Sequence, residues 1–434
     1  MCPGADGPLP LSRRLALVTA AVAESGYLTD QRIVVDGGSF LEEKTMDFEF
    51  TYEQQALREM AAKVVSTSWT EDIARTASAD LELDRERWRE LGQLDLIGLA
   101  VPEAFGGGGV GLLELQILAE ELGRSLARTP FLGTVGLAVS ALLESGDNAL
   151  QQQLLPGVCA GDTILSVVAS NQRGVWMAAD SGVVAHENAG GWTLDGRAAH
   201  VLDGVDADQL LVLADDSLFL VGGNHHGLTR TSLAPLDLTR RQAVLNFDSV
   251  PARLVGEQGD GRRVVASASD RAVTLLAAEQ LGTADRMLTL SVEYAKTRLQ
   301  FGRAIGSFQA IKHLCADMLV SVEHARSAAY HAGRAFDADV DDVRIASSLA
   351  HVICSQAAAK VTAGAIQVHG GIGFTWEHAA HLYFKRSTSD RALFGGTPWH
   401  LERLAVLVVD AECEPVATDS VMQGSQSQPP RTSG

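Results

Sequence analysis

Apolar positions along the chain follow three successive patterns. Between residues 46 and 162 they recur every three or four residues, as in amphipathic helices, with Thr51 placed as an N-cap before the first of them. Between 163 and 262 short apolar runs alternate with turn-prone glycine and aspartate segments, which is typical of β-strands. Between 263 and 412 the helical spacing returns in longer stretches. The pattern predicts a mainly α-helical protein with an inserted β domain, in which two helical parts form one body.

Individual helices follow from the same spacing. In the first part it predicts helices over 88–99, 112–126 and 134–155, and Pro156 with Gly157 is expected to end the third. Two apolar faces predict buried bundle helices in the last part: Ala277, Leu281, Ala284, Leu288, Val292 and Ala295 on one, and Leu314, Met318, Val322, Ala325 and Ala329 on the other.

The two ends of the chain differ from the rest. Residues 12–14 (SRR), followed by an apolar stretch, superficially resemble a twin-arginine export signal, but no clear mature start follows. Residues 26–38 (GYLTDQRIVVDGG) resemble the C-terminal end of a short-chain dehydrogenase, in a fragment too short to bury a core. Residues 1–45 are therefore interpreted as a non-functional extension, a fusion scar or a mis-assigned start, with Met46 as the expected functional beginning. Residues 413–434, rich in Ser, Gln and Pro, are predicted to be a disordered tail.

Composition narrows the class of protein. The 434 residues include 35 basic and 54 acidic side chains, a formal charge of −19, which argues against nucleic-acid binding because phosphates need a basic surface. No apolar run approaches the roughly 20 residues that span a bilayer, so no membrane segment is expected. The five cysteines are scattered and lack CxxC spacing, which indicates neither a disulfide framework nor a zinc site. A cytoplasmic protein is expected.

Two motifs carry the candidate chemistry. The run 294–310 reads YAKTRLQFGRAIGSFQA, and the run 367–374 reads QVHGGIGF. Arginine binds the oxygens of a diphosphate in a bidentate manner, glycines allow close backbone approach to a ligand, and Phe301 offers an apolar wall. Taken singly, the glycine run is also typical of a helix C-cap followed by a turn, and Arg298 of a surface ion pair. His369 is interpreted as a packing residue.

These motifs, together with 101–103 (VPE) and 192–196 (WTLDG), resemble in the same order those of the acyl-CoA dehydrogenases over residues 46–412. The resemblance implies an N-terminal helical domain, a middle β domain and a C-terminal four-helix bundle with the bounds given above. It further implies FAD as cofactor, an acyl-CoA thioester as substrate and an electron-transferring flavoprotein as electron acceptor. The residues that it assigns to FAD, most of them reaching across a subunit interface to a neighbouring chain, are Arg298, Gln300, Phe301, Gln367, Gly370, Gly371, Gly373 and Thr397.

Three features depart from the family. Gly395, in the stretch 393–398 (LFGGTP), stands where the family carries its catalytic glutamate, and glycine cannot remove the weakly acidic α-proton of the substrate. Relatives that place the base on an earlier helix would have it at position 272, which is Ala272 here. The loop 167–174 (VVASNQRG) lacks the pattern with which the family holds the flavin ring.

The departures leave three hypotheses. The first is the base-lacking subunit of a heteromeric, steroid-type acyl-CoA dehydrogenase, which completes the FAD site of a homologous base-bearing chain in a heterotetramer. The second is a self-sufficient homotetramer whose base has moved to Asp270 or Glu279, although Asp270 lies on another helix face than Ala272, and Glu279 lies two turns further along. The third is a module that binds a CoA ester or flavin without redox turnover. No residue identifies the acyl group.

Overall fold

The computed structural model describes residues 50–76, 82–180, 182–338 and 343–410. The predicted extension over 1–45 and the predicted tail over 413–434 lie outside these residues, as do the two resemblances within the extension.

The N-terminal region is helical, as its apolar spacing predicts. Its elements are α2 (Tyr52–Ser68), α3 (Glu71–Arg75), α4 (Arg85–Gln93), the short 3₁₀ helix η1 (Glu103–Phe105), α5 (Leu112–Arg124), the π-helix η2 (Leu132–Val139), α6 (Ser140–Glu144) and α7 (Asn148–Cys159). The predicted cap is present: the Gln54 backbone N–H donates to Thr51 Oγ1 (3.2 Å), and the Thr51 N–H donates to Gln54 Oε1 (3.0 Å).

Two predicted helices were wrong in their bounds. α4 stops at Gln93, well before Leu99, because Asp95 takes a left-handed conformation (φ 58°) that turns the chain. The predicted helix 134–155 is divided, since Gly146 (φ 68°) separates α6 from α7. α7 then continues through Pro156 to Cys159, because a proline in the last turn removes only one intrahelical hydrogen bond.

A seven-stranded sheet follows the helices. Its strands are β1 (Leu165–Val168), β2 (Val183–Asn188), β3 (Gly191–Leu202), β4 (Gln209–Ala214), β5 (Ser217–Gly222), β6 (Leu228–Ser232) and β7 (Gln242–Val255). The order is β1-β4-β5-β7-β3-β2, with β6 also paired to β7. β1 runs parallel to β4, and the other pairs are antiparallel. One apolar core is shared by this sheet, the N-terminal helices and the first half of the helix that follows the sheet, α8 (Gly261–Thr297).

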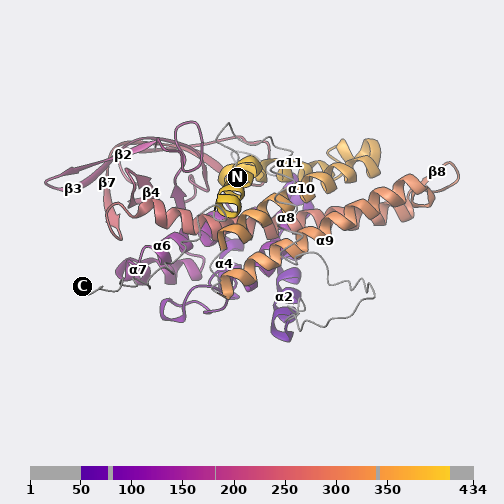
Figure 1. The fold of residues 1–434 in the computed structure, drawn as a ribbon, viewed down its shortest axis with the longest axis horizontal. Coiled ribbons are helices and arrows are strands. Elements are labelled where there is room, and N and C mark those ends of the chain that lie inside the picture. The colour runs from indigo at the N-terminus through magenta and orange to yellow at the C-terminus, as the bar shows by residue number, and fades with distance from the viewer. Residues whose placement is uncertain (1–49, 77–81, 181, 339–342, 411–434) are drawn as a thin grey trace, which may run out of the picture.

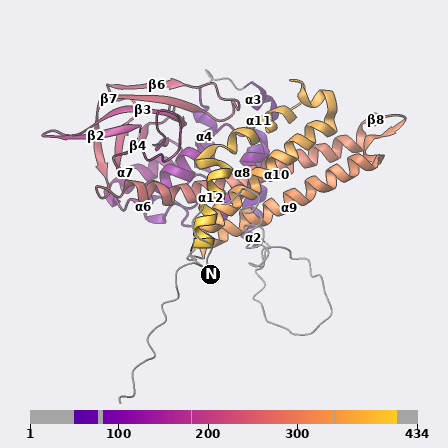
Figure 2. The same cartoon turned by 45° about the horizontal axis from the view of Figure 1, so that its top comes forward.

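The C-terminal region is a bundle of long helices with its own apolar core. Its elements are α8 (Gly261–Thr297), β8 (Leu299–Gln300), β9 (Arg303–Ala304), η3 (Ile305–Ser307), α9 (Gln309–Asp337), α10 (Val343–His369), η4 (Gly370–Phe374), α11 (Ala380–Asp390), η5 (Leu393–Gly395), α12 (Gly396–Ala405) and the π-helix η6 (Val406–Asp410). The sheet lies at one end of the molecule, and α8 and α9 carry the β8–β9 hairpin to the opposite end (Figures 1 and 2).

One apolar stretch is longer than the sequence led us to expect. Residues 343–374 are, within the described part of the chain, the single helix long and apolar enough to cross a membrane by length and composition. Of its most apolar window 67% is buried against the rest of the protein. Such burial is typical of a core helix, and α10 packs between α8 and α9.

Candidate functional site

The first motif forms the turn that joins α8 to α9. Arg298 is the C-cap of α8, and the following hairpin reverses at Phe301 (φ 51°) and Gly302 (φ 76°), where left-handed backbone is required. The Phe301 side chain is 91% exposed, and Arg298 and Gln300 are exposed as well. The motif therefore presents its side chains outward from the end of the bundle.

The second motif lies at the same end. Gln367 is exposed on the last turn of α10, and the chain then enters η4 through Gly370 (φ 62°). A methyl group added to Gly370 or Gly371 would meet no atom within 4 Å, so the surface beside both glycines is open. Gly373 is different, because its added carbon would lie 3.1 Å from the His369 Cβ. Gly373 thus serves the packing of the turn, and the other two glycines leave room for a ligand.

The two motifs are joined by a stack of rings. The His369 ring lies 4.6 Å from the Tyr294 ring of α8 and 4.2 Å from the His378 ring. Its Nδ1 lies 2.7 Å from the carbonyl oxygen of Ala365. Burial lowers the pKa of His369, which favours the neutral ring. Through its contact with Tyr294, which lies one helical turn before Arg298, His369 holds the end of α10 against the end of α8. His369 is therefore a packing residue, as expected.

The end of the bundle is basic and aromatic in an acidic chain. Lys296, Arg298, Arg303 and Lys312 are exposed there, and the Arg303 guanidinium lies 4.2 Å from the centre of the Phe308 ring. Phe374 is 72% exposed and Trp376 59% exposed. We call the surface formed by 296–303 and 370–376 the tip. Cationic, amide and aromatic groups of this kind suit a dinucleotide, whose diphosphate is anionic and whose rings are planar.

Thr397 does not belong to the tip. It is buried at the start of α12, where its Oγ1 lies 3.1 Å from the Oγ of Ser355 on α10. Ser355 precedes Gln367 by twelve residues of continuous helix, about 18 Å. The structure therefore brings the other predicted FAD contacts together and places Thr397 apart from them.

The position of the missing glutamate is shaped for glycine. Phe394 (φ 53°), Gly395 (φ 105°) and Gly396 (φ 67°) are three successive residues with positive φ. A Cβ added to Gly395 would lie 2.8 Å from ring atoms of Trp399, so this half-exposed ring would have to move. The backbone thus favours glycine, and a side chain here would displace Trp399.

The alternative positions for a base are occupied otherwise. Ala272 is fully buried, and it faces Gly136 of η2, whose added Cβ would lie in ordinary contact, 3.6 Å from the Ala272 Cα. Asp270 is buried in a bidentate ion pair with Arg403, one contact of which is 2.8 Å, and it accepts a hydrogen bond from Ser347 (3.1 Å). A carboxylate held in this way is not a free base, which argues against a base relocated to Asp270.

Glu279 is engaged in the same manner. It forms a buried ion pair with Arg240 of the loop before β7, and Arg386 of α11 lies 3.8 Å away. Arg240 also donates to Asp390 (3.0 Å), and Arg386 to Asp237 (2.6 Å). Burial raises the pKa of Asp390 to about 6, against the opposing effect of Arg240. This cluster fastens the β domain to the bundle, which likewise argues against Glu279 as a relocated base.

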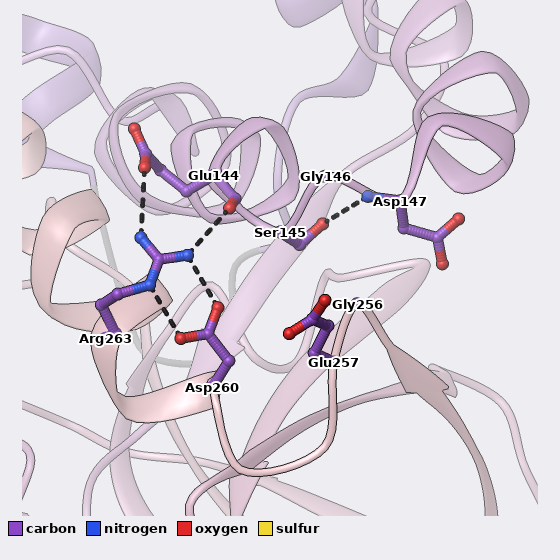
Figure 3. A pocket seen from close by; sticks show the side chains of 8 residues that line it. All are labelled: Glu144, Ser145, Gly146, Asp147, Gly256, Glu257, Asp260 and Arg263. Atoms are coloured by element: carbon purple, nitrogen blue, oxygen red, sulfur yellow. Dashed lines mark hydrogen bonds and ion pairs between the residues drawn. The ribbon is translucent and has the colours of Figure 1, made fainter.

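A surface cleft of about 600 Å³ is lined by other residues (Figure 3). Its lining residues are Glu144, Ser145, Gly146, Asp147, Gly256, Glu257, Asp260 and Arg263. Arg263 forms a bidentate pair with Asp260 at 2.7 Å and lies 3.8 Å from Glu144. In the described part of the chain no group of three or more histidine, cysteine, aspartate or glutamate side chains is placed to hold a metal ion. The cleft contains none of the predicted site residues.

Comparison with known proteins identifies the family. The model of the acyl-CoA dehydrogenase N-terminal domain matches residues 51–162, and that of the C-terminal domain matches residues 259–406. Over 354 residues the chain is 32% identical to acyl-CoA dehydrogenase IpdE2 of Mycolicibacterium smegmatis, covering 81% of this chain and 97% of that protein. The chain belongs to the acyl-CoA dehydrogenase family. FAD is the cofactor of this family, and the donor groups of the tip fit it.

Three further proteins are similar to this chain. Acyl-CoA dehydrogenase FadE34 of Mycobacterium tuberculosis is 35% identical over 367 residues, covering 82% of this chain and 48% of that protein, so this chain spans about half its length. The ChsE4-ChsE5 complex from Mycobacterium tuberculosis matches with a TM-score of 0.76 and 31% identity, covering 85% of this chain and 100% of that one. The Tcur3481-Tcur3483 steroid acyl-CoA dehydrogenase, G363A variant, matches at 0.75 and 33%, covering 83% and 99%.

Three residues around the absent base escaped prediction from the sequence. Trp399 covers Gly395, Phe394 is buried beside it, and the Trp176 ring packs edge-on against Phe394 at 5.2 Å. Trp176 comes from another segment than Phe394 and Trp399, and no spacing in the sequence connects position 176 with position 394. The one signal in the sequence was the altered loop 167–174 after the first strand, and Trp176 follows this loop by two residues.

Proposed function

We propose that this chain is the base-lacking subunit of a heteromeric acyl-CoA dehydrogenase and completes the FAD site of a homologous, base-bearing partner. The tip carries the proposal. Phe301 is 91% exposed, and Arg298, Gln300 and Gly370 lie on the same outward surface. Groups suited to FAD that face away from their own chain are complementary to a cofactor held mainly by another chain.

The state of the chain's own catalytic positions supports the same assignment. Gly395 and Ala272 lack a carboxylate, and Asp270 and Glu279 are neutralised by arginines. Removal of the α-proton then falls to the partner. Two of the similar structures are a complex of two named proteins and a steroid acyl-CoA dehydrogenase named for two components, which favours a partner of the same family and an acyl-CoA of steroid type.

In the proposed enzyme this chain binds and orients. Arg298 holds the diphosphate oxygens of FAD, Phe301 excludes water from one side of the dinucleotide, and the open backbone at Gly370 and Gly371 admits the cofactor closely. FAD, when bound, accepts the hydride that leaves the β-carbon of the acyl-CoA. An electron-transferring flavoprotein as final acceptor, a heterotetramer and a cytoplasmic location complete the proposal.

Co-expression tests the proposal. The chain is purified alone and together with a homologue that carries the family glutamate, and acyl-CoA-dependent dye reduction is measured for both. We expect turnover only in the complex, and its loss when the partner's glutamate is changed to glutamine. Turnover by the chain alone would refute the proposal. Acyl-CoA binding by a complex that lacks both FAD and turnover would favour a non-redox binding module.

A further inference from the structure

The loop between β1 and β2 places one indole ring between two distant segments. The Trp176 Nε1–H donates to the Oγ of Ser269 on α8 (3.3 Å). The same ring lies 5.2 Å from the Phe394 ring of η5, at 74°. The Met177 sulfur lies 3.9 Å from the Ser269 Oγ. A polar anchor and an aromatic contact thus fix the indole where the β domain meets the bundle.

This place adjoins both positions at which the family carries its base. Phe394 directly precedes Gly395, and Ser269 lies one helical turn before Ala272 on α8. The indole therefore lies between the two segments from which a base would act on a substrate. Phe394 is itself 4% exposed, so the volume around the indole is already filled from the bundle side.

The loop holds one conformation through its own hydrogen bonds. Asn171 Oδ1 accepts from the backbone N–H of Arg173 (2.9 Å) and of Val175 (3.0 Å). Asn171 Nδ2 donates to Asp180 (3.1 Å), which ties the two ends of the loop together. Gly174 (φ 80°) takes a left-handed turn against the His200 ring. These contacts indicate a fixed element of the fold and not a lid that swings open.

We propose that Trp176 is a built-in plug that fills the space between Ser269 of α8 and Phe394 of η5, and that its removal opens a slot for a planar aromatic heterocycle. The slot would be lined by the Phe394 ring, the Ser269 hydroxyl and the Met177 thioether, groups that accept a flat ring with polar edges. Only the identification of that ring with the flavin of FAD rests on the proposed function. The plug keeps this chain from holding a flavin ring of its own and reserves its tip for the partner's cofactor.

Binding of lumiflavin tests the plug, because this ligand has the flavin ring without the diphosphate that the tip would bind. The full-length chain, its Trp176→Gly variant and a Trp192→Gly control are titrated, and quenching of lumiflavin fluorescence is measured. Trp192 is a matched residue, since it is partly buried in the same domain and packs against the Phe219 ring at 5.2 Å. We expect about tenfold tighter binding by Trp176→Gly alone, the gain expected of one aromatic stacking contact.

A second variant guards against a failure to fold. Trp176→Phe keeps a ring against Phe394 and gives up the N–H and part of the volume, so we expect a smaller gain in affinity. No gain in either Trp176 variant, or an equal gain in Trp192→Gly, would overturn the plug and leave the proposed function standing. Tight FAD binding by the unaltered chain alone, with bleaching by acyl-CoA, would overturn the proposed function and the plug together.

Discussion

Restoring the family glutamate by Gly395→Glu is expected to destabilise the chain without giving it activity. Residue 395 has φ 105° and ψ −20°, and a side chain in left-handed backbone costs about 1–2 kcal/mol. The added Cβ would also lie 2.8 to 3.0 Å from three atoms of the Trp399 ring. The Trp399 ring is 47% exposed and can move aside, so relieving this overlap costs about 1 kcal/mol. Together we expect a loss of about 2–3 kcal/mol in the free energy of unfolding.

Urea denaturation followed by circular dichroism measures this loss, and three variants divide it. Gly395→Ala carries the backbone and Cβ effects without the charge and should lose most of the same free energy. Gly395→Ala combined with Trp399→Ala should recover part of it, because the overlap is gone. Gly371→Ala is the matched control, since nothing lies within 4 Å of its added carbon and its φ is not left-handed. A Gly395→Glu chain as stable as the unaltered one, and able to dehydrogenate acyl-CoA alone, would refute the reasoning.

Three further variants test separate parts of the account. Arg298→Ala should weaken FAD binding by the co-purified complex about 10- to 100-fold, as expected for the loss of charge-assisted hydrogen bonds. Arg344→Ala, which changes an exposed arginine at the other end of α10, should leave FAD binding unchanged. Equal retention of FAD by the two variants would contradict the role of the tip. Burial raises the pKa of Asp390 to about 6, so its contribution to stability is present below about pH 4 and is lost as pH rises through 6. Asp390→Asn should remove this pH dependence of the free energy of unfolding, about 3 kcal/mol at most, as measured by urea denaturation at several pH values. The pH dependence due to His351 has the opposite sign: burial lowers its pKa to about 4, so stability is lost as pH falls from about 6.5 to 4. His351→Leu should remove this loss of stability at acid pH. It should also raise stability overall, because neither ring nitrogen has a hydrogen-bond partner among the described residues.

Local features of the fold could be predicted from the sequence. The Thr51 cap, the change from helical to strand spacing and the return to long helices depend on neighbouring residues, and each is present. The tip was predictable as well, because its residues lie in two short motifs at the ends of consecutive bundle helices. Local rules failed where a single residue sets the backbone, as at Asp95 and Gly146, which divide helices that apolar spacing alone would continue.

The surroundings of the absent base could not be predicted in the same way. Asp270 meets Arg403 across 133 positions, and Glu279 meets Arg240 from another domain. Whether such a carboxylate is a base or an ion-pair partner depends on tertiary contacts that spacing does not contain. The same holds for Trp176 and Trp399, whose bulk closes positions that in sequence are marked only by the lack of a carboxylate.

The flavin content of the purified chain shows whether the labour is divided between two chains. Absorbance at flavin wavelengths, read against protein concentration, is measured for the chain alone and for its complex with a base-bearing homologue, before and after addition of acyl-CoA. The account predicts a colourless chain and a yellow complex that acyl-CoA bleaches. A yellow chain that acyl-CoA bleaches without any partner would contradict it.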